Sequence, residues 1–227
     1  MPRWTFGLLI ATLLGLSARV AAQPVPGDVV VNEFLYAPTP STNEYIELYN
    51  RSEAAIALHE LSFADDNRSF VPVAATDTSL APGAYAVLVR SPDVFGAAFP
   101  SVPVLVPADW PALNNGGDTI LLRHTPTRTG LDSVPYAPDW GGSDGRSLER
   151  IDPAGPPDQA RNFASSTAEA GGTPGARNSV YAPDETPPDV ETVTPSQSGD
   201  SLTVAFSEPV AAATVGPGAF ALVPDGA

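Results

Sequence analysis

Residues 29–50 read VVVNEFLYAPTPSTNEYIELYN, two runs of alternating apolar and polar residues around a turn rich in Pro, Ser, Thr and Asn. Alternation at period two directs one face of a strand toward a core and the other away from it. Two such runs around a turn predict a β-hairpin. The alternation is out of phase at Phe34, which we interpret as a β-bulge. This segment predicts the opening hairpin of a β-sandwich.

The rest of the sequence predicts an all-β fold. It contains 26 Pro and 19 Gly in 227 residues, a density of turn residues that favours short strands over helices. Runs with strand character recur at a spacing typical of a sandwich. They cover residues 28–36, 45–50, 56–63, 70–73, 84–89, 102–106, 119–124, 131–136 and 147–151. One short helix is expected at residues 92–99, capped by Ser91 and covering an open end of the sandwich.

The N-terminal segment predicts export. Arg3 precedes an apolar run over residues 6–16, and small residues follow up to Ala22. This run is shorter than the roughly 20 apolar residues that span a bilayer, and its small-residue end suits signal peptidase. We expect residues 1–22 to be a cleaved signal peptide, 23–27 to be a linker, and the mature protein to be secreted, periplasmic or at the cell surface. An uncleaved amphipathic or anchoring helix is the alternative.

Charge and cysteine content exclude several classes of protein. The chain has 26 acidic residues against 11 basic ones, all arginine, and a net charge of −15. Such a charge argues against a basic surface for nucleic acid. The absence of Cys excludes disulfides and cysteine-ligated metal sites. An exported protein of this composition depends on packed sheets for its stability.

Seven segments, taken in order, resemble the successive motifs of the lamin tail domain family as found in exported bacterial proteins. They are VVVNEFLYAP, NEYIELYNRS, LAPGAYAVLV, LNNGGDTILL, DSVPY, GRSLERI and GGTPGARNS. The resemblance implies an immunoglobulin-like β-sandwich over residues 28–180. Where the family usually has a Gly-Trp pair, this chain has LHELSF, which puts Phe63 in the aromatic position. The resemblance also implies a non-catalytic binding or structural module, often joined to other secreted domains.

A second module is expected after a Pro-rich linker at residues 181–188. Residues 189–227 resemble the start of a bacterial Ig-like (SbsA-type) domain, chiefly in the segment SLTVAFSEPV. These 39 residues are too few to close a sandwich. We therefore expect a truncated Ig-like domain, and a chain that is a fragment of a larger multidomain protein.

No catalytic residues are predicted. The loop GGSDG at residues 141–145 matches the Gly-x-Ser-x-Gly pattern of serine hydrolases, but a strand follows it where a helix is needed. No His lies downstream to act as the base. The two histidines, His59 and His124, belong to no cluster with metal-ligand spacing. The loop is expected to be a plain connection.

Three glutamates near the opening hairpin could be considered for glycoside cleavage, which requires two carboxyls across a cleft. They are Glu33, Glu44 and Glu47. No cleft is indicated by the pattern around them. We expect them to lie on strands next to the opening turn, where Arg146 or Arg150 from the last strand neutralises one of them. Such an ion pair between strands adds little stability if it is exposed.

The only cofactor considered is calcium, which takes six to eight oxygen ligands on flexible loops. Asp65, Asp66 and Asn67 are weak candidates for such a site, and residues 114–118, NNGGD, form a second and weaker group. Neither group has the spacing of a known calcium loop. Turn formation by Asn and Asp explains both groups without a metal.

Trp110 and Trp140 are the candidates for a binding surface. Each lies in a segment rich in Pro and Gly, where an aromatic ring can stack on a sugar or anchor a protein partner. The same pattern is typical of rings that close the end of a core. The sequence leaves both roles open.

The sequence therefore predicts an exported, non-catalytic β-sandwich module that binds protein or glycan in surface display or adhesion. The alternative is an accessory domain of a secreted hydrolase or calcium-dependent nuclease whose catalytic domain lies outside this chain. No nucleic-acid partner is expected, and the ligand is not identified by the pattern.

Overall fold

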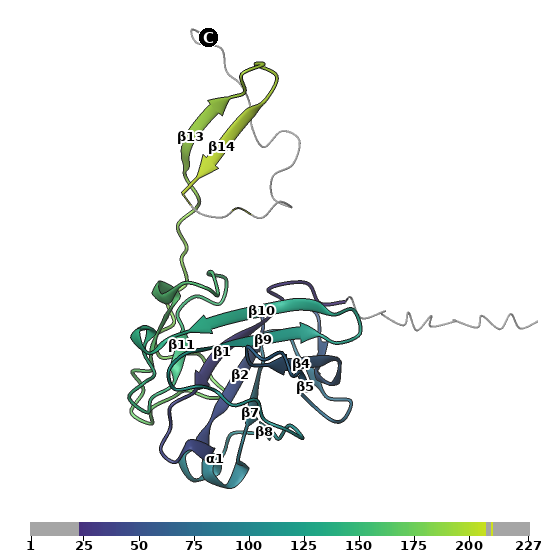
Figure 1. Cartoon of the computed structure of the whole chain (residues 1–227), viewed down its shortest axis with the longest axis vertical. Helices are drawn as coiled ribbons and strands as arrows, with labels where there is room; N and C mark the ends of the chain where they lie inside the picture. The colour runs from purple at the N-terminus through teal and green to yellow at the C-terminus, as the bar shows by residue number, and fades with distance from the viewer. Residues whose placement is uncertain (1–22, 208–209, 211–227) are drawn as a thin grey trace, which may run out of the picture. The chain divides into compact units, whose positions relative to one another are not determined.

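The computed structural model describes residues 23–207 and 210. The predicted signal peptide and residues 208–209 and 211–227 of the C-terminal segment therefore lie outside the described residues. The chain divides into two compact units, with the boundary between Pro183 and Asp184 (Figure 1). The domain bounds expected from the sequence stay a prediction.

The first unit contains a six-stranded sheet. Its order is β12 (Phe163–Ser165), β11 (Leu148–Arg150), β1 (Val29–Leu35), β2 (Tyr45–Asn50), β7 (Tyr85–Val89) and β8 (Val104–Leu105). Neighbouring strands are antiparallel except β7 and β8, which run parallel. Strand β2 has the bounds expected from the sequence, and the opening hairpin is confirmed.

A four-stranded antiparallel sheet forms the second layer. Its order is β10 (Thr129–Tyr136), β9 (Asp118–His124), β4 (Leu61–Ala64) and β5 (Val71–Pro72). Strands β3 (Ile56–Ala57) and β6 (Ser79–Leu80) pair separately. Short 3₁₀ turns complete the unit at η1 (Ser41–Asn43), η2 (Leu58–Glu60), η3 (Pro138–Trp140) and η4 (Ala160–Asn162). The all-β, Ig-like sandwich is confirmed.

The core lies between the two sheets and depends on a bulge in β1. The pairing of β1 with β2 shifts register between Val31 and Glu33. This shift restores the alternation, so that Val31 and Phe34 both enter the core. The ring of Phe34 packs against Tyr136 with centroids 5.0 Å apart. The irregularity that the sequence showed at Phe34 is therefore a bulge that begins just before it.

One expected strand is interrupted. Residues 56–63 form β3, the turn η2 and β4, because the chain leaves one strand pair at Leu58 and enters another at Leu61. Leu58 is buried in the core at this corner. Phe63 is also buried there, as expected for the aromatic position. The sequence pattern of apolar residues could not separate the two strands, since the corner itself is buried.

The short helix α1 (Pro92–Ala98) is confirmed. Phe95 packs with Leu35, Tyr45 and Val87 in a second apolar cluster. These strand positions face away from the main core, so α1 packs on the outer face of the six-stranded sheet, beside the turn η1 that joins β1 and β2. Ser91 is the N-cap residue, but its side chain makes no capping hydrogen bond.

The second unit contains a hairpin of β13 (Val190–Pro195) and β14 (Leu202–Phe206), paired antiparallel. Its assignment to an Ig-like domain stays a prediction, because residues 211–227 lie outside the described part of the chain. Over both units, no described helix combines the length and apolar character needed to cross a bilayer.

The packing of Phe34 gives a first prediction. Phe34→Ala removes a ring that is 0% exposed, and should lower the free energy of unfolding by about 3–5 kcal/mol. Val106→Ala, at a side chain that is 56% exposed, is the control and should change it by less than about 0.5 kcal/mol. Urea unfolding followed by tryptophan fluorescence measures both. Similar losses in the two variants would contradict this account of the core.

Candidate functional site

Three glutamates lie side by side on the outer face of the six-stranded sheet. Glu33 on β1 is opposite Glu149 on β11 and Glu47 on β2. All three are fully buried. Among the ion pairs of the described residues, none includes any of them. We call these three residues the glutamate row. Arg146 or Arg150 was expected to neutralise one of Glu33, Glu44 and Glu47, and that expectation is wrong.

The arginines of the last strand have other partners. Arg150 forms a buried ion pair with Asp132, with 2.6 Å between Nη2 and Oδ2. Arg146 donates to the backbone carbonyls of Ser166 and Ala168. Side chains alternate between the two faces of β11, so Arg150 points to the core side while the neighbouring Glu149 points outward. Arg150 therefore cannot reach the glutamate row.

Residues 171–180, which we call the strap, cover the glutamate row. The backbone N–H of Thr173 donates to Glu33 over 2.8 Å, and that of Gly175 donates to Glu47 over 2.5 Å. The backbone N–H of Val180 donates to Glu149 over 3.1 Å. Each carboxyl of the row therefore accepts a backbone hydrogen bond from the strap, which satisfies acceptors that burial has removed from water.

Side chains complete these contacts. The hydroxyl of Tyr45 donates to Glu33 over 2.5 Å. The hydroxyl of Ser179 donates to Glu149 over 2.8 Å, and the hydroxyl oxygen of Thr173 lies 3.0 Å from an oxygen of each of Glu33 and Glu149. Hydrogen bonds to charged acceptors are the stronger class, so they offset part of the cost of burying the row.

A pair of buried asparagines extends the network. The side chain of Asn32 donates to Glu47 over 2.9 Å and to the side-chain oxygen of Asn178 over 2.8 Å. Asn178 in turn donates to the backbone carbonyls of Asn32 and Arg150, over 2.9 and 2.8 Å. Asn32 in the first strand and Asn178 in the strap therefore join segments that are far apart in the sequence.

Gly172 allows the strap to approach the row. A Cβ at this position would collide with the Tyr45 hydroxyl and would lie 2.7 Å from Oε1 of Glu33. No side chain fits without moving the strap or the sheet. Glycine is therefore required at position 172, because the strap and the sheet are in close contact there.

An open pocket of about 290 Å³ lies beside the strap. Two of its walls come from the outer faces of β2 and β7, where Tyr49 and Tyr85 stand opposite each other. Their rings are stacked, with centroids 4.9 Å apart and 27° between the planes. Burial raises the pKa of Tyr85 to about 12. Its hydroxyl therefore stays neutral and can donate a hydrogen bond at any physiological pH.

The remaining pocket residues come from the strap and from the loops around it. They include Arg51, Asp152, Arg177 and Tyr181. The guanidinium of Arg177 lies over the Tyr181 ring, 5.2 Å from its centroid. Sequence reasoning missed this pocket because its residues are spread over more than 130 positions. The signal for it was the outward position of both tyrosines in the strand alternation.

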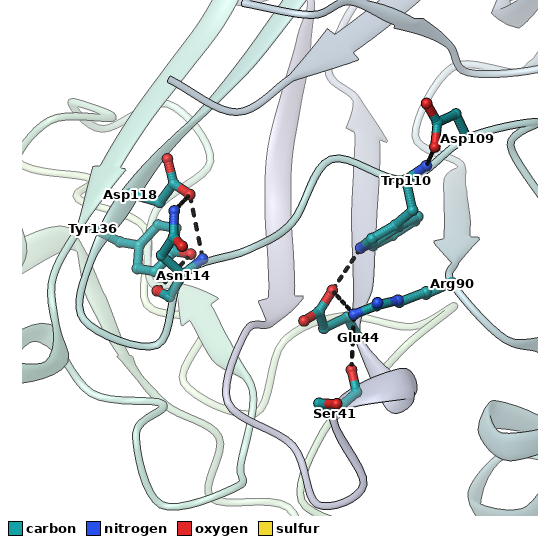
Figure 2. A network of polar contacts seen from close by, with 8 residues as sticks. All are labelled: Ser41, Glu44, Arg90, Asp109, Trp110, Asn114, Asp118 and Tyr136. Atoms are coloured by element: carbon teal, nitrogen blue, oxygen red, sulfur yellow. Dashed lines mark hydrogen bonds and ion pairs between the residues drawn. The ribbon is translucent and has the colours of Figure 1, made fainter. Parts of the chain in front are cut away.

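Trp110 is held by a polar network (Figure 2). Its indole N–H donates to Glu44 over 2.7 Å, and Arg90 pairs with the same carboxylate oxygen over 3.2 Å. The indole ring packs edge-on against Phe63, with centroids 5.7 Å apart. The ring therefore covers the core and fixes the loop that carries it. A role for Trp110 in binding stays a prediction.

Trp140 lies in η3 and is also only partly buried. Its ring packs against Phe163 with centroids 5.5 Å apart, at the edge of the main core. The following loop, with Ser143, leads into β11 and not into a helix, so a nucleophile elbow is not formed. Trp140 therefore packs against the core, and a role for it in binding stays a prediction.

The two groups considered for calcium come together in space. One carboxylate oxygen from each of Asp65, Asp66 and Asp118 lies within 4.8 Å of the others. Asp118 accepts hydrogen bonds from the backbone N–H groups of Asn114, Thr119 and Asp66, and Figure 2 shows its contacts with Asn114. Asp65 likewise accepts from Asn67. These contacts stabilise the two turns against each other, and calcium stays the weak alternative to turn formation.

The family model described as Lamin Tail Domain matches residues 22–138. No curated protein matches the chain. Strands β11 and β12 and the strap lie beyond the matched residues, although they complete the same sheet and bury the glutamate row.

The fit of Gly172 gives a second prediction. Gly172→Ala should lower the free energy of unfolding by about 1–3 kcal/mol, because the added methyl group overpacks a buried site. Gly96→Ala in α1 is the matched control, since nothing lies within 4 Å of the added Cβ. It should be neutral or stabilise by up to about 1 kcal/mol. Equal stability of the two variants in urea unfolding would contradict the close contact.

The glutamate row gives a third prediction, on pH. Burial raises the pKa of Glu33 above 4.5, and burial together with the charge of Glu33 raises the pKa of Glu47 well above 4.5. The folded state therefore binds protons more tightly than the unfolded state. Stability should fall as the pH rises from about 4.5 through the raised pKa values, and should level off above them. Burial also raises the pKa of three further carboxyls, those of Glu44, Asp65 and Asp132, which contribute to the same dependence.

Urea unfolding between pH 5 and pH 8 measures this dependence. Glu47→Gln keeps the shape of a protonated carboxyl and should reduce the slope of stability against pH. Glu53→Gln, at an exposed position, is the control with the same change in charge and should leave the slope unchanged. A slope in Glu47→Gln equal to that of the unaltered chain would show that the row does not carry the dependence.

Proposed function

Because this chain belongs to the lamin tail domain family, a family of non-catalytic Ig-like β-sandwich domains, we propose that it is an exported module that binds protein or glycan at the cell surface. Its role in that case is display or adhesion within a larger protein. Three observations support this proposal: the pocket beside the strap, the structural hydrogen bonds of the glutamate side chains, and the net negative charge of the chain.

The pocket carries the proposal. Tyr49 and Tyr85 come from adjacent strands and are stacked on each other, so their positions are set before any ligand arrives. The opposite wall belongs to the strap, which the glutamate row holds in place. A preformed pocket with aromatic walls and a few polar groups is typical of ligand sites on rigid scaffolds.

The carboxyls that a glycosidase-like mechanism would need have structural partners. Glu33 and Glu47 are covered by the strap, and Glu44 is bound by Trp110 and Arg90. Each of the two histidines lies 3.4 Å from a carboxylate oxygen, that of Asp77 for His59 and that of Glu60 for His124. These observations support a binding role over a catalytic one.

Export and the class of partner rest on sequence features. Residues 1–22 have the layout of a signal peptide, and a net charge of −15 disfavours nucleic acid as the partner. A secreted, periplasmic or surface location follows from the first feature. The described β-sandwich then acts outside the cytoplasm, where glycans and surface proteins are available.

A fourth prediction tests this function. The purified chain, fluorescently labelled, is applied to an array of immobilised glycans and surface proteins. The double variant Tyr49→Ala/Tyr85→Ala should lose the binding that the unaltered chain shows, since it loses the aromatic wall of the pocket. Phe70→Ala, a partly exposed ring that Arg123 covers at 3.6 Å, is the control and should bind normally.

Melting midpoints of the variants separate loss of binding from loss of folding. Undiminished binding by a folded double variant would remove the pocket from the proposal. Hydrolysis of a bound glycan by the unaltered chain would overturn the non-catalytic reading.

A further inference from the structure

The charged residues that line the pocket beside the strap are mostly basic, unlike those of the chain as a whole. Two exposed arginines, Arg51 and Arg177, line it together with a single carboxylate, Asp152. The chain as a whole has a net charge of −15. Within the described residues, neither arginine takes part in an ion pair. An acidic protein that gathers unpaired guanidinium groups at one pocket favours an anionic ligand there.

Both guanidinium groups are held in position from the side. Arg51 donates from Nη1 to the backbone carbonyl of Gly27 over 3.0 Å. Arg177 lies over the ring of Tyr181, an arrangement that a cation and an aromatic face stabilise. A guanidinium has five N–H donors in a planar fork, so each group retains donors that match a carboxylate.

The aromatic wall indicates what the anion is attached to. Tyr49 and Tyr85 present a stacked pair of rings at the pocket, an apolar surface with hydroxyl groups at its rim. A sugar ring has the matching character, because its C–H groups are apolar and its hydroxyls are polar. Asp152 also lines the pocket, and its carboxylate can accept hydrogen bonds from such hydroxyls.

The position and size of the pocket favour a glycan over a peptide. Strands β2 and β7 are interior strands of the sheet, so their backbone groups are already paired and cannot accept an added strand. The volume of about 290 Å³ is at the lower end for ligand pockets. It suits one ring of an oligosaccharide with its neighbours lying outside, since the pocket is open.

We propose that this pocket binds a carboxylate-bearing sugar residue of an acidic glycan. The ring lies against the Tyr49–Tyr85 pair, and the sugar carboxylate accepts hydrogen bonds from Arg51 and Arg177. The inference rests on the proposed function and names its ligand class. It also assigns the strap a role in binding, because the strap supplies Arg177.

The test compares acidic oligosaccharides with uncharged ones of the same shape. The probes are oligogalacturonate, a hyaluronan oligosaccharide and sialyllactose, each paired with its carboxyl methyl ester, in isothermal titration calorimetry. At least one acid form should bind about tenfold or more tightly than its ester, as expected for a charge-assisted hydrogen bond. The preference should shrink when salt is raised from 50 to 500 mM, because the charges are exposed.

Three variants assign the effect to residues. Arg177→Gln and Arg51→Gln should each weaken binding of the acid form about tenfold and leave the ester nearly unchanged. Tyr85→Ala should weaken both forms, since it removes the aromatic wall. Arg128→Gln, an exposed arginine in the turn between β9 and β10, is the control with the same change in charge and should bind like the unaltered chain.

The outcomes separate this inference from the proposed function. Equal binding of acid and ester, still dependent on Tyr85, would overturn the acidic ligand class and leave the binding function standing. If none of the three acid and ester pairs binds, but array binding still requires Tyr49 and Tyr85, the acidic ligand class is also overturned. The binding function then stands, and a protein ligand is favoured. Failure of the probes together with loss of all pocket-dependent array binding would overturn both.

Discussion

The rest of this structure depends on the buried glutamate row and the strap that covers it. Glu33, Glu47 and Glu149 would each be costly to remove from water, and three of them together repel one another. Hydrogen bonds from strap residues such as Thr173 offset that cost, and they bring together groups up to 140 residues apart. Without the strap, the outer face of the sheet would be an acidic surface. With it, that face becomes a second buried layer and one wall of the pocket.

The opposite face of the same strands contains a second buried polar contact. The ion pair of Arg150 and Asp132 joins the two sheets, and the backbone N–H of Val31 donates to the same Asp132 oxygen over 2.8 Å. This donor lies at the start of the bulge in β1. Removing either charge would leave the other buried and unpaired, which would strongly destabilise the fold. Strand β11 is therefore fixed by polar contacts on both of its faces.

The candidate pocket depends on this arrangement of sheet and strap, and the sequence indicated a binding surface at other residues. Trp110 and Trp140 were candidates because they are aromatic rings in predicted loops. In the structure both rings pack against the core, and Trp110 also donates a hydrogen bond to Glu44. Tyr49 and Tyr85 are 36 positions apart and look like ordinary strand residues. Only the pairing of β2 with β7 stacks them, and only the strap brings Arg177 to their side.

The sequence by itself determined most of the strands, the bulge near Phe34, the helix α1 and the family, because alternation, turn residues and ordered motifs are local properties of the chain. It could not determine the surroundings of Glu33 and Glu47. In a strand, a polar residue at an outward position is read as exposed, since period two distinguishes the two faces but not what covers the outer one. Tertiary structure decided that, by placing a segment 140 residues away over the opening hairpin. Contacts of that range depend on the whole path of the chain, and no local pattern records them.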